Sequence, residues 1–276
     1  MNQNQIAIIG NGYIGSVEYF LFKDHYNVIA YDTEISRCSM KEENGEKIPI
    51  GKEDVNKCKL AIICVPTKIN SNNSPNLDLV KSVLSWLETD LVLIKSSIPP
   101  GYTKELENEF KKKIVFSPEF VGTTNYGSTK SIFYKNADLR DFPFFIFGGD
   151  PSLTTKLVDI YQKVLGPEKK YIQCEHETAE LVKFTTNCYF TMKLVTFGNF
   201  AKKCKEKGVD YNKLRELFLD QTQESRWHTS VFKEDPFEST ERSSYYSGIC
   251  LPKDVRILDF VMENNGIDSC LSQFFN

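Results

Sequence analysis

The sequence of 276 residues is poor in the side chains that mark metal-binding and disulfide-stabilised proteins. It has three histidines, His25, His176 and His228, and none stands at ligand spacing from another. Its eight cysteines include no C-x-x-C pair, and several lie inside apolar runs. We therefore expect free thiols in a reducing compartment, a cytoplasmic location and no metal site.

Long apolar runs and an excess of basic residues are also missing. No apolar stretch approaches the roughly 20 residues that a membrane-spanning helix needs. The first residues, Met1 to Gln5, contain no signal-peptide core. With 34 Lys and Arg against 37 Asp and Glu, the net charge of −3 does not indicate a surface for nucleic acid or anionic membranes. We expect neither of these among the partners.

The first 32 residues follow the pattern of a dinucleotide-binding unit. An apolar run at 5–9 leads into Gly10-Asn11-Gly12-Tyr13-Ile14-Gly15, a helical stretch and a second apolar run at 28–31 that ends at Asp32. The glycines allow a tight turn, close approach of the backbone to a pyrophosphate and close packing of the helix, whose N-terminus attracts phosphates. Asp32 can accept hydrogen bonds from ribose hydroxyls, which favours NAD, whereas Arg37 would suit the 2′-phosphate of NADP.

Apolar segments continue to alternate with helical ones up to residue 173. Strands are predicted at 60–65, 91–95, 114–116, 144–147 and 171–173, and the segments 38–56 and 70–76 are predicted to be connections, the former a short helix or loop. Alternation of strands and helices predicts an α/β fold with a parallel, doubly wound sheet. We expect residues 1–173 to form a Rossmann-type NAD-binding domain.

Three polar segments follow predicted strands, where ligands bind in such sheets. They are Cys64-Val65-Pro66-Thr67, Ser96-Ser97-Ile98-Pro99 and Ser117-Pro118-Glu119-Phe120.

Residues 174–276 are predicted to form a mostly helical second domain around one long helix at about 176–207. Apolar residues surround nearly the whole of this helix, so it must be buried, and we expect part of the burial to come from a second copy in a homodimer. Lys183 and Asn187 interrupt the apolar surface at i, i+4 and share one face. Another helix is predicted from Tyr211, and residues 221–247 are predicted to form a long functional or mobile loop.

Near the C-terminus, the segment Tyr246-Ser247-Gly248-Ile249-Cys250-Leu251-Pro252-Lys253-Asp254 places one cysteine at or just before a predicted helix N-terminus. That position favours the thiolate, which is the reactive form of cysteine. Asp254 is expected about one turn further on, on the same side as Cys250. The alternative is that Cys250 is a small buried hydrophobic side chain, as most cysteines are.

Seven segments, in order and across nearly the whole chain, resemble the UDP-glucose / GDP-mannose dehydrogenase family. They are Gly10-Asn11-Gly12-Tyr13-Ile14-Gly15, Cys64-Val65-Pro66-Thr67, Ser96-Ser97-Ile98-Pro99-Pro100-Gly101, Ser117-Pro118-Glu119-Phe120, Ala179-Glu180-Leu181-Val182-Lys183-Phe184-Thr185-Thr186-Asn187, Gly208-Val209-Asp210 and Gly248-Ile249-Cys250-Leu251-Pro252-Lys253-Asp254. The resemblance implies NAD-dependent oxidation of the C6 alcohol of a UDP-hexose, UDP-glucose first among them, to a carboxylate in two hydride transfers.

The resemblance also implies roles for residues at the matching positions. Cys250 would be the nucleophile that carries a thiohemiacetal and then a thioester, and Lys183 would stabilise oxyanions. Asn187 would orient the intermediate, and Asp254 would handle protons with a water. Glu119 would assist proton transfer or hydrolysis, and Ser97 would hold the water. Cofactor contacts are expected from Gly10, Gly12, Tyr13, Ile14, Gly15, Asp32, Arg37, Val65, Pro66, Thr67 and Ser97, and substrate contacts from Glu119, Phe120, Val121, Lys183, Asn187, Arg226, Tyr246 and Gly248.

Three departures from the family pattern bear on the substrate. Thr123 stands where the family usually has a second glutamate, and Tyr245 and Ser247 stand where glycines are expected. The chain is also expected to lack the family's C-terminal UDP-binding domain. Nucleotide binding would therefore be weaker, or come from the 221–247 loop, or use a partner subunit. Two alternatives therefore stay open. One is a UDP-glucuronate decarboxylase that makes UDP-xylose through transient C4 oxidation and needs no thiol; the other is a non-catalytic protein that binds NAD or a nucleotide sugar.

Overall fold

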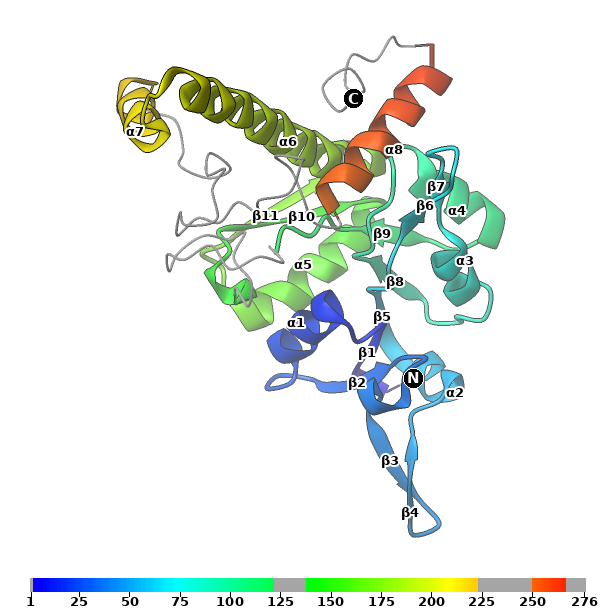
Figure 1. Ribbon diagram of the computed structural model, residues 1–276. Coiled ribbons are helices and arrows are strands. Elements are labelled where there is room, and N and C mark those ends of the chain that lie inside the picture. The colour runs from blue at the N-terminus through cyan, green and yellow to red at the C-terminus, as the bar shows by residue number, and fades with distance from the viewer. Residues whose placement is uncertain (1, 122–137, 223–249, 267–276) are drawn as a thin grey trace. The chain divides into compact units, whose positions relative to one another are not determined.

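The computed structural model describes residues 2–121, 138–222 and 250–266, and Figure 1 draws the chain as a ribbon. The chain divides into two compact units, residues 1–121 with 136–183 and residues 122–135 with 184–276. The predicted boundary between functional domains after residue 173 stays a prediction.

A seven-stranded sheet with the order β11-β10-β9-β8-β5-β1-β2 forms the centre of the first unit. Its strands are β1 (Asn2–Ile9), β2 (Asn27–Tyr31), β5 (Cys58–Ile63), β8 (Leu91–Ile94), β9 (Ile114–Phe116), β10 (Phe144–Gly148) and β11 (Lys170–Cys174). Every residue of β8 and β9 is buried, as expected for strands covered on both faces. The predicted α/β fold is confirmed.

Besides the start of a longer helix, the α-helices in the described residues of this unit are α1 (Tyr13–Phe22), α2 (Lys52–Asn56), α3 (Asp78–Leu84), α4 (Tyr102–Phe110) and α5 (Pro151–Leu165). In Figure 1, α1 and α5 lie on one side of the sheet and α3 and α4 on the other. The sheet is therefore doubly wound, as predicted.

The sheet is not wholly parallel, because β10 runs antiparallel to β9 through the pair Gly148 and Phe116. A parallel neighbour would need a crossover, usually a helix, whereas an antiparallel pair does not. Between these two strands the described residues contain only the 3₁₀ helix Leu139–Asp141. The prediction of a parallel sheet is corrected at this one pair.

A β-hairpin occupies much of the segment predicted to be a short helix or loop. Strands β3 (Met40–Glu43) and β4 (Glu46–Pro49) pair antiparallel, and α2 follows them. The turn residues Asn44 and Gly45 have φ values of 52° and 79°, the positive values that the Asn-Gly hairpin turn requires. Around the segment 70–76, two short strands, β6 (Lys68–Ile69) and β7 (Pro75–Asn76), also pair.

The described part of the second unit is helical. Helix α6 (His176–Lys207) begins in the first unit and continues into the second, with the predicted bounds. Gly208, with a φ of +66°, ends it, and α7 (Tyr211–Thr222) and α8 (Cys250–Asn264) follow. A core joins α6 to α7 and consists of Phe197, Ala201, Cys204, Tyr211 and Leu219.

Helix α7 begins at the predicted Tyr211 and covers the first two residues of the predicted 221–247 loop, whose remaining residues 223–247 lie outside the described part of the chain. Across the described ranges, no helix has both the length and the apolarity to cross a membrane.

Candidate active site

The glycine-rich turn lies between β1 and α1, and its glycines meet different demands. Gly10 has a φ of +86°, which favours glycine. At Gly15 a Cβ atom would overlap the Gly10 carbonyl oxygen, because α1 packs closely on the turn. At Gly12 a Cβ atom would meet nothing within 4 Å. Close packing thus explains Gly15, whereas the space beside Gly12 suits a group that is not part of the protein.

Asp32 follows β2 and lies against the same turn. Its Oδ2 accepts a hydrogen bond from the Asn11 amide at 2.8 Å, and its Oδ1 accepts one from the Glu34 amide at 2.9 Å. The Arg37 guanidinium forms an ion pair with Glu34 at 2.9 Å. The carboxylate needed for a ribose is therefore at the tip of β2, while the arginine is engaged with a neighbouring acid.

The ends of β5 and β8 complete this edge of the sheet. A Cβ on Gly10 would come within 3.0 Å of the Cys64 carbonyl, so the segment 64–67 lies close to the glycine turn. The Ser96 hydroxyl donates to the Val65 carbonyl at 2.7 Å and links the two strand ends. The structure thus brings Gly10, Asp32 and Val65 to one edge of the sheet, as the sequence predicted. The backbone amides at the start of α1 and the Asp32 carboxylate fit a dinucleotide.

A cluster of buried charges lies beneath this edge. The Lys95 ammonium is 3.1 Å from Glu18 Oε1 and 3.5 Å from Glu119 Oε2, and the Lys95 side chain is 2% exposed. The Tyr161 hydroxyl donates to Glu18 Oε2 at 2.9 Å. These residues come from α1, α5 and the ends of β8 and β9, so the sheet and the two helices enclose the cluster.

The charges within the cluster depend on each other. Burial alone would lower the pKa of Lys95, but the carboxylates of Glu18 and Glu119 outweigh it and raise that pKa. Burial, together with nearby Glu18, raises the pKa of Tyr161 well above its usual value. Lys95 therefore keeps its proton at neutral pH, and Tyr161 stays a neutral donor.

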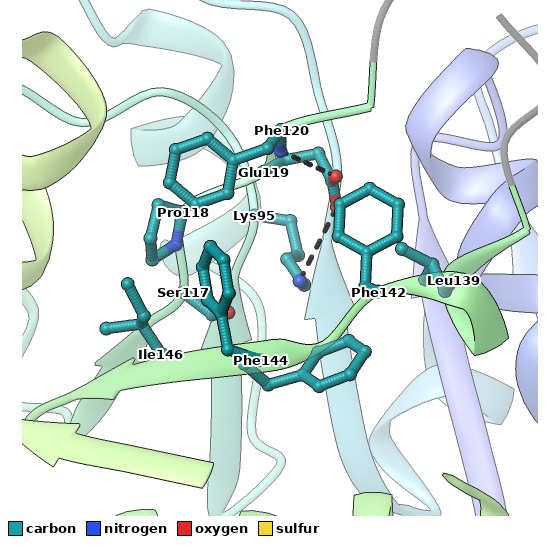
Figure 2. Close-up of a pocket in the computed structure, with 10 residues that line it drawn as sticks. Lys95, Ser117, Pro118, Glu119, Phe120, Leu139, Phe142, Phe144 and Ile146 are labelled. Atoms are coloured by element: carbon teal, nitrogen blue, oxygen red, sulfur yellow. Dashed lines mark hydrogen bonds and ion pairs between the residues drawn. The ribbon is translucent and has the colours of Figure 1, made fainter. Parts of the chain in front are cut away.

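The Glu119 carboxylate is held on both oxygens. Its Oε1 accepts hydrogen bonds from the amides of Phe120 at 2.7 Å and Val121 at 2.8 Å, while Oε2 faces Lys95 (Figure 2). The Glu119 carbonyl oxygen, in turn, accepts a hydrogen bond from the Lys183 ammonium. Four of the predicted site residues are therefore joined through one short segment, 119–121.

A small pocket lies on the Glu119 side of this cluster (Figure 2). Phenylalanine rings form much of its wall, and its charged lining groups are Lys95 and Glu119. Apolar walls strengthen the attraction between these two charges. The lining consists of Lys95, Ser117, Pro118, Glu119, Phe120, Leu139, Phe142, Phe144, Phe145 and Ile146.

The second unit holds the cysteine segment. Helix α8 includes Cys250, which is the first described residue after 222 and is exposed; the predicted helix start at this cysteine stays a prediction. Asp254, one turn later, is fully buried. Its Oδ2 accepts a hydrogen bond from the Asn187 side chain at 2.6 Å, and its Oδ1 is 2.9 Å from the Lys253 ammonium. The structure therefore brings Asn187 and Asp254 together, one turn from the thiol.

Cys250 differs from the buried cysteines in its surroundings. The seven cysteines in the described ranges are all free, and Cys250 is the exposed one among them. Burial raises the pKa of Cys188 to about 12, with Asp254 and Asp259 contributing, and raises that of Cys58 to about 12 as well. Those two side chains are therefore inert thiols at neutral pH, whereas Cys250 is accessible to a reactant.

Several predicted residues cannot be compared with the structure. Arg226, Tyr246 and Gly248 lie outside the described residues, as do Thr123, Tyr245 and Ser247.

Four residues of the candidate site were not predicted from the sequence. Glu18, Lys95 and Tyr161 form the buried charge cluster, and Lys253 contacts Asp254. A signal existed for two of them, because Lys95 ends an apolar strand and Glu18 interrupts the apolar residues of its helix.

Comparisons with known proteins identify similar chains. Residues 177–274 match the "UDP-glucose/GDP-mannose dehydrogenase family, central domain". The UDP-glucose 6-dehydrogenase of Streptococcus pneumoniae is 24% identical, over 92% of this chain and 68% of its own length. The UDP-N-acetyl-D-mannosamine dehydrogenase of Methanococcus vannielii is 28% identical, over 75% of this chain and 52% of its own. The chain thus spans 52% to 68% of the length of these relatives.

Solved structures share the fold. A UDP-glucose dehydrogenase from Pyrobaculum islandicum superposes with a TM-score of 0.75 at 20% identity, over 99% of this chain and 67% of that one. A UDP-D-ManNAc dehydrogenase from Pyrococcus horikoshii gives 0.72 at 21% identity, over 97% and 66%. At such identities the likeness establishes the architecture, a mostly parallel sheet followed by helices.

Proposed function

We propose that the chain is a member of the UDP-glucose/GDP-mannose dehydrogenase family, whose central-domain model matches residues 177–274, and that it oxidises the C6 alcohol of a UDP-sugar to a carboxylate with NAD. UDP-glucose is the first substrate to test, and UDP-N-acetylmannosamine is the second, since relatives carry both names. The observation that carries the proposal is the exposed Cys250 in α8, one turn from the buried Asp254–Asn187 pair.

The family uses NAD, and the glycine turn has the features to hold it. The backbone at Gly12 and the amides at the start of α1 would face the pyrophosphate, and Asp32 would accept hydrogen bonds from the ribose. When bound, NAD supplies the hydride acceptor for each oxidation. The remaining chemistry belongs to side chains of the protein.

Cys250 would act after the alcohol has become an aldehyde. An aldehyde carbon cannot give up a second hydride to reach the acid level until a nucleophile adds to it. The Cys250 thiolate forms that bond, and the carbonyl oxygen takes a proton to give a thiohemiacetal. Its oxidation leaves a thioester, and water then displaces the sulfur to release the acid and the free thiol.

Residues of both units have separate roles in this proposal. The Lys183 ammonium would stabilise negative charge on the substrate oxygen. Asp254, oriented by Asn187 and Lys253, would exchange protons through a water. Glu119 Oε1 already accepts two backbone hydrogen bonds, so any proton transfer by this residue would use Oε2, which faces Lys95.

A product assay by mass spectrometry with simultaneous recording of NADH tests the proposal. A uronic acid formed from UDP-glucose or UDP-N-acetylmannosamine, with about two NADH per sugar, would support it, because alcohol-to-acid oxidation removes two hydrides. Loss of carbon dioxide from UDP-glucuronate without accumulation of NADH would instead support the decarboxylase. If no substrate changes while NAD binds, the non-catalytic alternative is favoured.

Two glycine substitutions separate packing from cofactor binding. Gly15→Ala forces a Cβ against the Gly10 carbonyl, so we expect the free energy of unfolding to fall by about 1–3 kcal/mol. Gly12→Ala meets no protein atom within 4 Å, so thermal stability should be kept while NAD affinity falls by about tenfold. Thermal melts and NAD titrations of both variants measure these effects. An unchanged NAD affinity in Gly12→Ala would contradict the assignment of the turn.

The proposed homodimer has support from an apolar stripe on α6. Tyr189, Met192 and Phe200 are 50%, 38% and 40% exposed, although all three are large and apolar. At about 100° per residue, these positions fall on one side of the helix. A second copy packing there would bury them, which agrees with the prediction that the long helix is shielded by a partner.

Met192→Glu should weaken such a dimer, because it would bury a charge at the contact. We expect sedimentation velocity to give a monomer at concentrations where the unchanged protein is a dimer. Lys205→Glu is the matched control, since it introduces the same residue on the opposite, exposed side of α6. A dimer that persists in Met192→Glu would place the interface elsewhere.

A further inference from the structure

The buried charge cluster of the first unit is poorly explained by stability. Glu18 is fully buried and the Lys95 side chain is 2% exposed, yet buried ion pairs contribute little to stability once the loss of hydration is counted. Apolar residues of similar volume would serve as well or better in that respect. The presence of these buried charges therefore needs another explanation, and the contacts of Lys95 with the sheet and with Glu119 suggest one.

Lys95 is fixed at one end by the sheet. Its amide donates to the Ile63 carbonyl at 2.9 Å, so its backbone is tied to β5 directly after β8 ends. At the other end, its ammonium reaches Glu18 Oε1 and Glu119 Oε2. Tyr161 holds the second oxygen of Glu18, so the counter-ion is itself anchored. Lys95 thus links the sheet, through an ion pair, to the segment that follows β9.

The segment 119–121 connects the position of Lys95 to that of Lys183. The Glu119 carboxylate, held by Lys95, accepts the amides of Phe120 and Val121, which fixes the peptide planes after residue 119. The carbonyl of the same Glu119 accepts the Lys183 hydrogen bond, and the Lys183 ammonium lies 5.3 Å from the centre of the Phe120 ring. The positions of the Glu119 carbonyl and the Phe120 ring, which both contact Lys183, therefore depend on the position of the Glu119 carboxylate.

We propose that Lys95 is a positioning residue for Lys183: its ammonium holds the Glu119 carboxylate and thereby places the Glu119 carbonyl that Lys183 contacts. Glu18 serves as the second anion, which balances Lys95 and keeps its ammonium between two carboxylates. An effect of Lys95 on catalysis rests on the oxyanion-stabilising role proposed for Lys183. The positioning of Lys183 by Lys95 does not depend on that role.

The test compares Glu18→Gln with the double variant Glu18→Gln/Lys95→Met. In Glu18→Gln, Lys95 remains and pairs with Glu119 alone. In the double variant no ammonium lies beside the Glu119 carboxylate. We then expect kcat to fall a further 10- to 100-fold, about the loss that a 1 Å misplacement of Lys183 would produce. The KM for NAD should be equal in the two variants, because the glycine turn is unchanged. A purely structural role would lower the melting temperature without this separation of kcat from KM.

A second readout needs no turnover. The ¹⁵N–¹H signal of the Lys183 ammonium, assigned by its loss in Lys183→Met, should shift between the double variant and Glu18→Gln but keep its position in Gly12→Ala. If the shift occurs while no UDP-sugar is oxidised by the unchanged protein, the proposed function fails and the positioning stands. If the signal and kcat are both the same with and without Lys95, the positioning is overturned.

Folding of the double variant is checked by its melting curve. Should it not fold, Glu18→Gln/Lys95→Gln replaces it, because a glutamine is polar but too short to repeat the contact with Glu119. A folded Lys95→Gln form with the kcat and Lys183 signal of Glu18→Gln would overturn the proposal just as directly.

Discussion

Cys250→Ala should lower acid formation from a UDP-sugar by at least about 10³-fold, which is the scale of losing a nucleophile that carries a covalent intermediate. NAD affinity and melting temperature should stay the same, because Cys250 is exposed and the glycine turn lies in the other unit. The sharpest assay supplies the 6-aldehyde directly and measures conversion to the acid, since that half of the reaction needs the thiol.

Cys174→Ala is the matched control for this experiment. Cys174 is also partly exposed, and it lies at the end of β11 with no assigned role. We expect it to keep full acid formation. A Cys250→Ala protein that still converts the aldehyde at an undiminished rate would rule out the thioester route, and the decarboxylase and binding-protein alternatives would gain, because neither uses a thiol.

Asp254→Asn should lower kcat by about 10²- to 10⁴-fold, the usual contribution of a positioned proton-transfer group. Asparagine keeps the size of the side chain and can still accept the Asn187 hydrogen bond, but it cannot take up a proton. The variant also removes a negative charge beside Lys253, so some loss of stability is expected. Activity is therefore measured well below the melting temperature, with folding followed by circular dichroism.

Asp259→Asn provides the comparison within the same helix. In the described part of the chain, Asp259 Oδ1 is buried without a hydrogen-bond partner, so an amide is tolerated there. We expect kcat to remain at the starting value. Equal losses in the two variants would mean that any neutralised acid in α8 disturbs the enzyme, and Asp254 would lose its assigned role.

Elements with a strong apolar pattern were predictable to within two residues at each end. The bounds of β9 and α6 agree with the sequence analysis, because one is a continuous apolar run and the other a long helical pattern with a clear end signal. The β3–β4 hairpin was not predicted, because its strands are short and mostly polar and carry little periodicity. Its Asn44-Gly45 turn was the available signal.

Some parts of the candidate site were likewise predictable from the sequence, and others were not. A helix that carries Cys250 and Asp254 followed from local sequence, whereas the Asn187–Asp254 contact was not predicted. The Glu18–Lys95 pair joins residues 77 positions apart through the packing of α1 on the sheet, which no local pattern reveals. The roles of the individual residues stay predictions until variants are measured.

The strand order also has a consequence for how the protein is made. After β1 and β2 have paired, β5 adds on the free side of β1, and β8, β9, β10 and β11 then each add beside the strand before them. No strand has to enter between two that are already paired. Because domains begin to fold during synthesis from the N-terminal end, the sheet can lengthen in step with the ribosome, one edge at a time.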